Sequence, residues 1–340
     1  MRPLVSIVIL NWNGKEHLAR CLRSLARITY APVEIIVVDN HSSDGSVAMA
    51  RKKFPRVLLV ENQTNRGFSG GNNDGIRASR GMFIFIFNND TEVEKSFLEP
   101  LVRLMEADSS IGCVQPKLVY GNDHNLLNAV GSYLTSTGFL YHYGYRKDAS
   151  DPKYNARLTI YSAKGAAMML RREALDRVGT FDEDFFIYFE ETDLCHRLWL
   201  SGYKVIYEPK SVIYHYEAVD THKQMKNSFI MYLSYRNRIA SYLKNLSLPS
   251  IFRLFPNMSL FYILSCAIYP FAVLRALLWN IWMLPNIMNK RRLVQRSRKI
   301  NDNALFQSIW RDPPLVYYYY LFKSLKYYHN EPSLVETNRY

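Results

Sequence analysis

The chain has 340 residues, of which 48% are hydrophobic, 14% aromatic and 21% charged, and its formal net charge is +13. This composition excludes an intrinsically disordered chain, because it supplies enough apolar surface to bury a core. The length accommodates one large domain with an appendage or two ordinary domains, and composition alone does not choose between them.

The basic excess lies entirely in the last third of the chain. Residues 1–220 hold 26 basic and 26 acidic residues, whereas residues 221–340 hold 17 basic and 4 acidic residues. We therefore expect two physically different parts, a neutral one over 1–220 and a basic one over 221–340.

The cysteines and the N-terminus both favour a cytoplasmic protein. The four cysteines lie far apart and form no C-x-x-C pair, which argues against a disulfide framework or a zinc site. The first apolar run, Val5–Leu10, enters a polar turn at once and lacks a small-residue cleavage site. We expect it to be a first strand rather than a signal peptide.

Short apolar runs alternate with helical patterns over the first 90 residues. Unbroken apolar strands separated by helices predict a parallel sheet that is covered on both faces. Between the third and fourth strands, a Gly/Asn-rich loop is expected to lead into a helix near Asn73–Ser79. The predicted strands are Val5–Leu10, Glu34–Val38, Val57–Val60 and Met82–Phe87.

Polar residues follow the predicted strands. Asn11 ends the first, Asp39 the second, and Asn88-Asn89-Asp90 the fourth. Ligands of parallel sheets bind beyond the carboxyl ends of the strands, so a cleft is expected there. The competing interpretation is that these residues only make turns and helix caps.

Two of these segments suit a nucleotide diphosphate. An acidic residue at Asp90 can hold Mg²⁺ or Mn²⁺ against a pyrophosphate, because these cations prefer oxygen ligands and use few protein groups. The loop Asn65–Asn73 resembles a phosphate cradle in which glycine backbone N–H groups and Arg66 approach the anion. It matches neither G-x-G-x-x-G nor the P-loop pattern, which disfavours dinucleotide and P-loop proteins.

Three carboxylates follow an aromatic run at a predicted helix start. Glu190, Glu191 and Asp193 come directly after Phe185–Phe189. Aromatic neighbours raise a carboxylate's pKa, while a helix N-terminus favours the anion, so one of the three is a candidate general base. The alternative is an ordinary acidic first helical turn.

The second half of the neutral part is less regular. Residues 111–165 predict irregular strands bordering an acceptor site, followed by a helix near Arg172–Val178. Lys204–Tyr207 and Ser211–Tyr214 are predicted as two strands, with His215 at the end of the second. A structural role is the first interpretation of His215, because a lone histidine is more often structural than a metal ligand.

Together, the motifs from about Val5 to Tyr216 resemble the family 2 glycosyltransferases of the GT-A fold, especially the branch with bacterial rhamnosyltransferases. The resemblance implies an α/β fold with a mostly parallel sheet flanked by helices. It divides the catalytic domain, 1–220, into a nucleotide-sugar half over about 1–110 and an acceptor half over about 111–220.

The resemblance also implies site residues. Asp90 and His215 would hold Mg²⁺ or Mn²⁺, with Asn88 in place of the first acid of the family's metal motif. Glu191 stands at the base position, where the family usually has Asp, so the base stays open among Glu191, Glu190 and Asp193. The implied nucleotide-sugar-binding residues are Asn11, Asp39, Asn65, Arg66, Gly67, Gly70, Asn72, Asn89 and Asp90.

The implied activity is inverting, metal-dependent transfer of a sugar to a glycan or polyprenyl-linked acceptor in cell-surface polysaccharide synthesis. The donor would be a dTDP- or UDP-sugar, with dTDP-L-rhamnose favoured by the branch. The alternative is a catalytically weak nucleotide-sugar-binding scaffold of a membrane glycan-assembly complex. A processive synthase is disfavoured because the chain lacks a Q-x-x-R-W motif.

The region 221–340 predicts a helical, membrane-associating extension. Residues 258–274 carry no charge but contain Pro270, and six basic residues lie between 290 and 299. This pattern favours an interfacial or re-entrant helical pair over 254–289 at the cytoplasmic membrane surface, peripheral or monotopic, over a true span. The alternative is a buried hairpin or a homo-oligomer contact. Nucleic acid binding is disfavoured because the sequence contains no motif that recognises nucleic acid.

Overall fold

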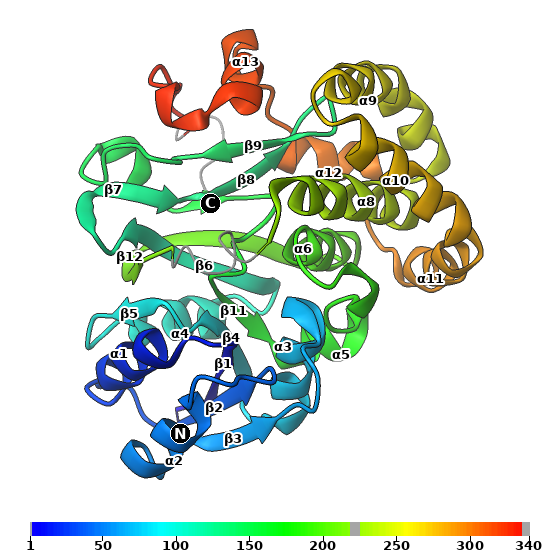
Figure 1. Ribbon diagram of the computed structural model, residues 1–340. Coiled ribbons are helices and arrows are strands. Elements are labelled where there is room, and N and C mark those ends of the chain that lie inside the picture. The colour runs from blue at the N-terminus through cyan, green and yellow to red at the C-terminus, as the bar shows by residue number, and fades with distance from the viewer. Residues whose placement is uncertain (1, 218–224, 335–340) are drawn as a thin grey trace.

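The computed structural model describes residues 2–217 and 225–334, and within them ten strands form one mixed sheet (Figure 1). The main path of the sheet runs β10-β12-β6-β11-β4-β1-β2-β3, with β5 paired to β12 and β7 to β6. The strands of the first half are β1 (Val5–Asn11), β2 (Val33–Asp39), β3 (Leu58–Glu61), β4 (Phe83–Asn88), β5 (Thr91–Val93) and β6 (Ile111–Tyr120). The later strands are β7 (Asp123–Ala129), β10 (Leu158–Thr159), β11 (Ala167–Arg171) and β12 (Lys204–His215).

Most of the sheet is parallel, as the apolar runs predicted. β1 pairs in parallel with β2 and β4, β2 with β3, and β12 with β6, whereas β11 lies antiparallel between β4 and β6. The parallel register sets Asn11 beside Asp39 and Leu10 beside Asn88. The polar residues at these strand ends therefore meet at one edge of the sheet.

Helices cover both faces of the sheet, because alternate residues of each strand face opposite sides. Ile7 and Ile9 pack with one group of helices, while Val8 and Ile36 pack with the other. The first group is α1 (Lys15–Leu25), α2 (Ser46–Lys53) and α4 (Leu98–Ala107). The second group is α3 (Gly67–Ala78), α5 (Arg172–Val178) and α6 (Glu190–Leu200).

Two predicted elements differ from the observed ones. The predicted Gly/Asn-rich loop is mostly helix, because α3 already begins at Gly67. A Cβ added to Gly71 would overlap Leu10, and one added to Gly75 would overlap Val8, so these glycines let α3 pack directly on β1. The two strands predicted on either side of Pro209 are one strand, β12, whose register shifts between Glu208 and Val212.

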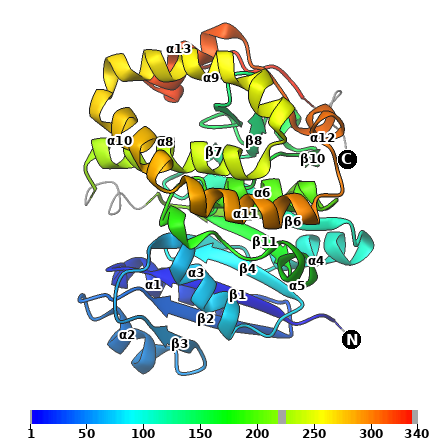
Figure 2. The same cartoon turned by 90° about the vertical axis from the view of Figure 1, so that its right-hand side faces the viewer.

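The C-terminal region is helical and lies against the sheet domain (Figures 1 and 2). α8 packs against α10, α11 and α6, and α9 packs against α10. Pro270 begins α10 instead of lying inside a longer helix. The helices are α8 (Asn227–Asn245), α9 (Leu248–Ile268), α10 (Pro270–Trp282), α11 (Leu284–Ser297), α12 (Asp302–Ile309) and α13 (Leu315–Lys323).

Among the described residues, one helix, α9, is long and apolar enough to cross a membrane, and α10 with α11 passes the same test as a pair bent by 68°. Length and composition alone are weak evidence for a span. The division into domains at residue 220 and the membrane association of this region stay predictions.

The last described residues cover a separate hairpin of β8 (Gly131–Leu134) and β9 (Leu140–Tyr143). The Tyr317 hydroxyl on α13 donates to Leu140 O at 3.0 Å. Glu331 accepts from Gly144 N and from the Tyr154 hydroxyl, both at 2.7 Å. The C-terminal segment therefore stabilises the part of the structure that the sequence predicted to border the acceptor.

Candidate active site

A cavity lies at the carboxyl ends of β1, β2 and β4. Four of the predicted donor-binding residues, Asn65, Gly67, Asn89 and Asp90, line it. Further residues of the lining come from the turn after β1, from the first turn of α3 and from the segment before α6. The cleft predicted from the polar strand ends is therefore present.

Asn11 and Asp39 lie directly behind this lining. The Asn89 amide donates to Asn11 Oδ1 at 2.8 Å, and the Asn11 amide donates to Asp39 Oδ1 at 3.1 Å. The other oxygen of Asp39 accepts from the backbone N–H of Ser42 at 2.8 Å. One chain of hydrogen bonds thus fixes three predicted residues from β1, β2 and the turn after β4.

Three other predicted donor-binding residues do not line the cavity. Arg66 forms ion pairs with Asp74 and Glu183. Gly70 packs against the Arg66 side chain, and the Asn72 amide donates to Phe68 O at 2.9 Å. These contacts order the start of α3, and a direct role in donor binding for Arg66, Gly70 and Asn72 stays a prediction.

Asn40 also lines the cavity, although the sequence analysis did not select it. Its amide donates to Asn65 Oδ1 at 2.8 Å and to Gly67 O at 3.0 Å, and its Oδ1 accepts from Arg66 N at 3.0 Å. It joins the end of β2 to the start of α3. The signal in the sequence was its place directly after Asp39, at the end of a strand.

The aromatic run before α6 forms one wall of the cavity in a strained conformation. Phe186, Tyr188 and Phe189 have positive φ angles of 64°, 72° and 72°. Bulky residues rarely adopt this region, at a cost of about 1–3 kcal/mol each. Asn237 on α8 offsets this cost, because its amide nitrogen lies 2.7–3.0 Å from the carbonyl oxygens of Phe185, Ile187 and Tyr188.

Asp90 and His215 come together at the edge of the cavity, although 125 positions separate them in the sequence. His215 Nε2 lies 3.3 Å from Asp90 Oδ1. His215 Nδ1 lies 3.0 Å from Asn128 Oδ1, and the Asn128 amide donates to Glu217 at 2.7 Å, which fixes the orientation of that amide. The Nδ1 atom therefore carries a proton, and Nε2 faces the carboxylate.

This arrangement fits a cation. Burial lowers the pKa of His215, but the charge and hydrogen bond of Asp90 and the charge of Glu217 together outweigh burial and raise that pKa overall. A neutral imidazole nitrogen and a carboxylate that face each other need a positive charge between them, either a proton or a metal ion. Residues 2–217 and 225–334 contain no group of three or more potential His, Cys, Asp or Glu ligands. A metal here would therefore use Asp90, His215 and oxygen atoms from outside the chain.

The three carboxylates of α6 have different environments. Burial and the neighbouring Glu191 raise the pKa of Glu190 well above its ordinary value. Burial also raises the pKa of Glu191, although the charge of Lys164 partly offsets this effect. Burial would raise the pKa of Asp193 too, but Lys244 and Arg197 outweigh it and lower that pKa.

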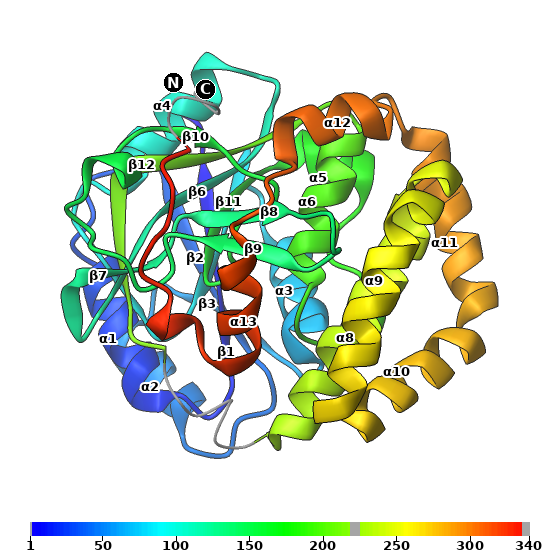
Figure 3. The same cartoon turned by 90° about the horizontal axis from the view of Figure 1, so that it is seen from above.

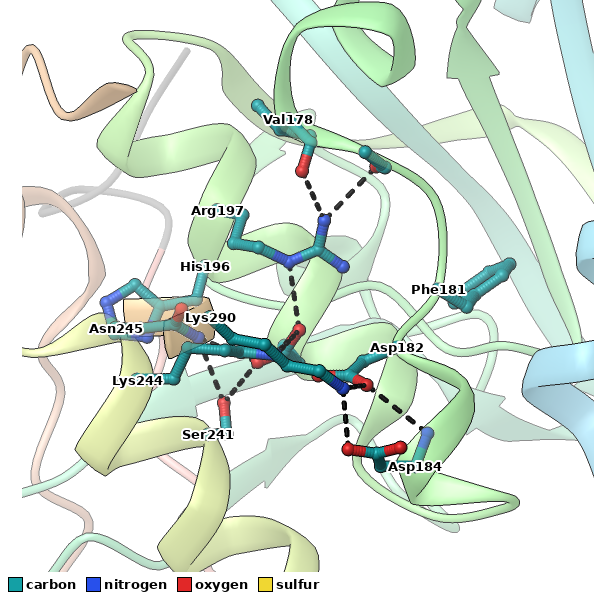
Figure 4. A network of polar contacts seen from close by, with 12 residues as sticks. Val178, Phe181, Asp182, Asp184, His196, Arg197, Ser241, Lys244, Asn245 and Lys290 are labelled. Atoms are coloured by element: carbon teal, nitrogen blue, oxygen red, sulfur yellow. Dashed lines mark hydrogen bonds and ion pairs between the residues drawn. The ribbon is translucent and has the colours of Figure 1, made fainter. Parts of the chain in front are cut away.

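Asp193 serves as an anchor inside the protein rather than at the cavity, and Figure 4 shows its partners Arg197, Ser241, Lys244 and Asn245. Its side chain is fully buried and accepts hydrogen bonds from four side chains. These donors are Arg197 Nε at 2.9 Å, Ser241 Oγ at 2.9 Å, Lys244 Nζ at 2.9 Å and Asn245 Nδ2 at 2.8 Å. Lys244 also pairs with Asp182 at 2.6 Å, and Lys290 pairs with Asp184 at 2.6 Å, so α8 and α11 both hold the segment that leads into α6.

This fold and this strand-end site define the class of the protein, a glycosyltransferase of the GT-A type. Residues 6–179, just over half of the chain, match the model of the family described as "Glycosyl transferase family 2". The chain belongs to this family, and the expectation drawn from its motifs is confirmed.

Two curated relatives illustrate the similarity. The chain is 26% identical over 251 residues to N-acetylglucosaminyl-diphospho-decaprenol L-rhamnosyltransferase of Mycobacterium tuberculosis, covering 65% of this chain and 78% of the relative. It is 25% identical over 238 residues to the low-salt glycan biosynthesis hexosyltransferase Agl10 of Haloferax volcanii, covering 69% and 74%.

Solved structures share the fold at low sequence identity. GalNAc-T7 with UDP, GalNAc and Mn²⁺ matches with a TM-score of 0.57 and 17% identity, over 71% of this chain and less than half, 48%, of that chain. The mannosyltransferase PcManGT of Pyrobaculum calidifontis with GDP-Man and Mn²⁺ matches with a TM-score of 0.52 and 15% identity, over 87% and 86%. These likenesses confirm the predicted GT-A fold.

Proposed function

We propose that this glycosyltransferase is inverting and metal-dependent, and that it moves L-rhamnose from dTDP-L-rhamnose to a hydroxyl of a lipid-linked glycan. The observation that carries the proposal is the cavity at the strand ends, with the Asp90–His215 pair at its edge. The rhamnose donor and the lipid-linked acceptor rest on the printed name of the Mycobacterium relative. Cell-surface polysaccharide synthesis is the corresponding role.

The residues of the cavity would bind the donor. Asp90 and His215 would hold Mg²⁺ or Mn²⁺, which when bound offsets the negative charge of the departing nucleoside diphosphate. Contact of Asn11 and Asp39 with the nucleoside is proposed from the family resemblance alone, because both side chains are buried behind the cavity lining. The start of α3 at Gly67 would face the donor, because it lines the same cavity.

Glu191 is the proposed general base. Its side chain is partly exposed, and the charge of Lys164 partly offsets the burial that raises its pKa. Glu190 is buried with a pKa well above the ordinary value, so it favours the protonated form, which cannot accept a proton. Glu191 would take the proton of the acceptor hydroxyl as its oxygen attacks the anomeric carbon opposite the leaving group, and this single displacement inverts the configuration.

The C-terminal helices would place the enzyme at the cytoplasmic face of a membrane, in a peripheral or monotopic manner. Phe252, Phe271 and Trp282 on α9 and α10 have exposed fractions of 74%, 80% and 75%. Part of the basic run is used inside the protein, because Lys290 pairs with Asp184 and Arg298 pairs with Asp302. The membrane contact would therefore rest more on the apolar faces than the charge pattern alone suggested.

The test is a donor screen with the purified full chain, Mg²⁺ or Mn²⁺, a lipid-linked acceptor, and a panel of dTDP-, UDP- and GDP-sugars. The proposal predicts turnover of one donor, with loss of turnover on chelation and in Asp90→Ala and Glu191→Gln. If a nucleotide sugar bound without any turnover, the scaffold function would replace the enzymatic one. Turnover that persisted in both variants would contradict the assigned residues.

A further inference from the structure

An apolar groove of about 400 Å³ lies between α8, α9 and α10. Figure 3 shows these helices on the side of the molecule next to α6. Met258, Tyr262 and Cys266 of α9 line the groove together with Leu243 and Val273 from its other walls. Exposed apolar side chains of α9 and α10 lie outside it, among them Leu264 at 50%.

A cationic group adjoins this groove. Tyr262, a lining residue, is hydrogen-bonded to Arg238 of α8. The Arg238 guanidinium carbon lies 4.1 Å from the ring centroid of Phe139 and 5.5 Å from that of Phe189, which directly precedes Glu190 and Glu191. Arg238 therefore contacts both a residue of the groove and the residue that precedes the two glutamates.

The Arg238 guanidinium is incompletely satisfied. Its Nε and Nη1 atoms are buried and find no hydrogen-bond partner among residues 2–217 and 225–334. A buried N–H group of a charged side chain without an acceptor costs more than about 1–3 kcal/mol, and guanidinium groups bind phosphate oxygens with two parallel hydrogen bonds. An anionic ligand would supply the missing acceptors.

Lys164 is a second cation close to the base. Its Nζ lies 3.4 Å from His142 Nδ1, and its charge acts on Glu191. Burial lowers the pKa of His142 well below its ordinary value, and the charges of Lys164 and Arg238 both lower it further. The charges of both cations thus act on the same imidazole, and that of Lys164 also acts on Glu191.

We propose that Arg238 and Lys164 bind the phosphate group of a lipid-linked acceptor whose hydrocarbon chain lies in the groove between α8, α9 and α10. This inference rests on the proposed function and adds the acceptor-binding residues to it. Arg238 contacts Tyr262 of the groove on one hand and Phe189, next to the two glutamates, on the other, which matches the order of chain, phosphate and sugar hydroxyl in such a lipid.

The test measures protection of Cys266 from N-ethylmaleimide in the detergent-solubilised full chain. Cys266 lines the groove and is partly exposed, whereas Cys21, Cys113 and Cys195 are buried. The probes are farnesyl diphosphate, farnesol, which has the chain alone, and inorganic pyrophosphate, which has the anion alone. Farnesyl diphosphate should protect at a concentration about tenfold or more below that of farnesol, and pyrophosphate should not protect.

Two variants remove one cation each. Arg238→Gln and Lys164→Met should each raise the protecting concentration of farnesyl diphosphate about tenfold, without changing that of farnesol. Arg253→Gln is the matched control, because Arg253 is exposed on α9 and stacks on Trp310 away from the groove. In Arg253→Gln the protecting concentration of farnesyl diphosphate should equal that in the unmodified protein.

The outcome separates this inference from the proposed function, because protection of Cys266 requires no donor. Binding of dTDP or UDP with Mn²⁺ is measured on the same samples and reports on the donor site. Equal protection by farnesol and farnesyl diphosphate would overturn the phosphate assignment. Full protection by phosphatidylglycerol vesicles, unaffected by either variant, would overturn the acceptor site and identify the groove as a bilayer contact.

Discussion

Asn237 Nδ2 donates to Tyr188 O at 2.7 Å and so ties helix α8 to a strained residue next to Ile187 in the wall of the cavity. Asn237→Leu keeps the volume and removes this donor, so the segment before α6 should relax from its positive φ angles. We expect kcat to fall about tenfold or more, with a loss of about 1–3 kcal/mol of stability. Steady-state kinetics and chemical unfolding measure both effects. Asn227→Leu, at the exposed start of α8, is the control, and full activity of Asn237→Leu would contradict the role of this contact.

The buried Asp193 carboxylate should make stability depend on acid pH. Its pKa is lowered in the folded state, because Lys244 and Arg197 outweigh burial, so it contributes stability above its unfolded pKa of about 3.9 and loses it as pH falls. Asp193→Asn should cost about 3–5 kcal/mol at pH 7, and this difference should shrink below about pH 4. Urea unfolding at several pH values measures it. A difference that did not change with pH would refute the ion-pair explanation.

Lys244 and Lys290 provide a matched pair in the same network. Their side chains are 4% and 31% exposed, and both contact Asp182. Lys244→Met should destabilise the protein by about 3–5 kcal/mol, because it leaves buried carboxylates unpaired, whereas Lys290→Met should cost about 1 kcal/mol or less. Thermal and urea unfolding of both variants compare the two costs. Equal losses of unfolding free energy in the two variants would show that burial does not determine the strength of these ion pairs.

Asn128 should tune the metal site without being a ligand. It orients His215 through Nδ1, and loss of such an outer partner typically weakens metal affinity about 10–100-fold. Asn128→Ala should therefore raise the Mn²⁺ concentration for half-maximal activity by about this factor. Asn125→Ala, on the exposed part of β7, should leave it unchanged. An unchanged Mn²⁺ requirement in Asn128→Ala would argue against His215 as a ligand.

Membrane binding should depend on the apolar faces of α9 and α10. Phe271→Glu combined with Trp282→Glu should reduce co-sedimentation with phosphatidylglycerol vesicles about tenfold or more, because both side chains are largely exposed. Leu315→Glu on α13, where the exposed fraction is 86%, is the control for surface charge and should have little effect. Equal losses in both proteins would indicate non-specific repulsion from the vesicles.

The sequence was sufficient to predict the sheet and the position of the cleft, because an apolar run that ends in polar residues is a local pattern. It was misleading at Gly67–Asn73, where glycines that let α3 approach Leu10 and Val8 looked like a loop. Local sequence also could not separate Asp193 from Glu190 and Glu191. Their difference depends on Lys244, which lies 51 positions beyond Asp193 and approaches it only in the folded chain.

The most direct test of the account is calorimetric binding of dTDP and UDP to the full chain in the presence of Mn²⁺, which requires no acceptor. The account predicts binding that weakens about tenfold or more on chelation and in Asp90→Asn, because Asp90 would hold a metal that offsets the charge of the diphosphate. Glu191→Gln should bind as the unmodified protein does, since Glu191 acts on the acceptor. No binding of either nucleotide, or binding that neither chelation nor Asp90→Asn weakens, would contradict a metal-dependent donor site at the ends of β1, β2 and β4.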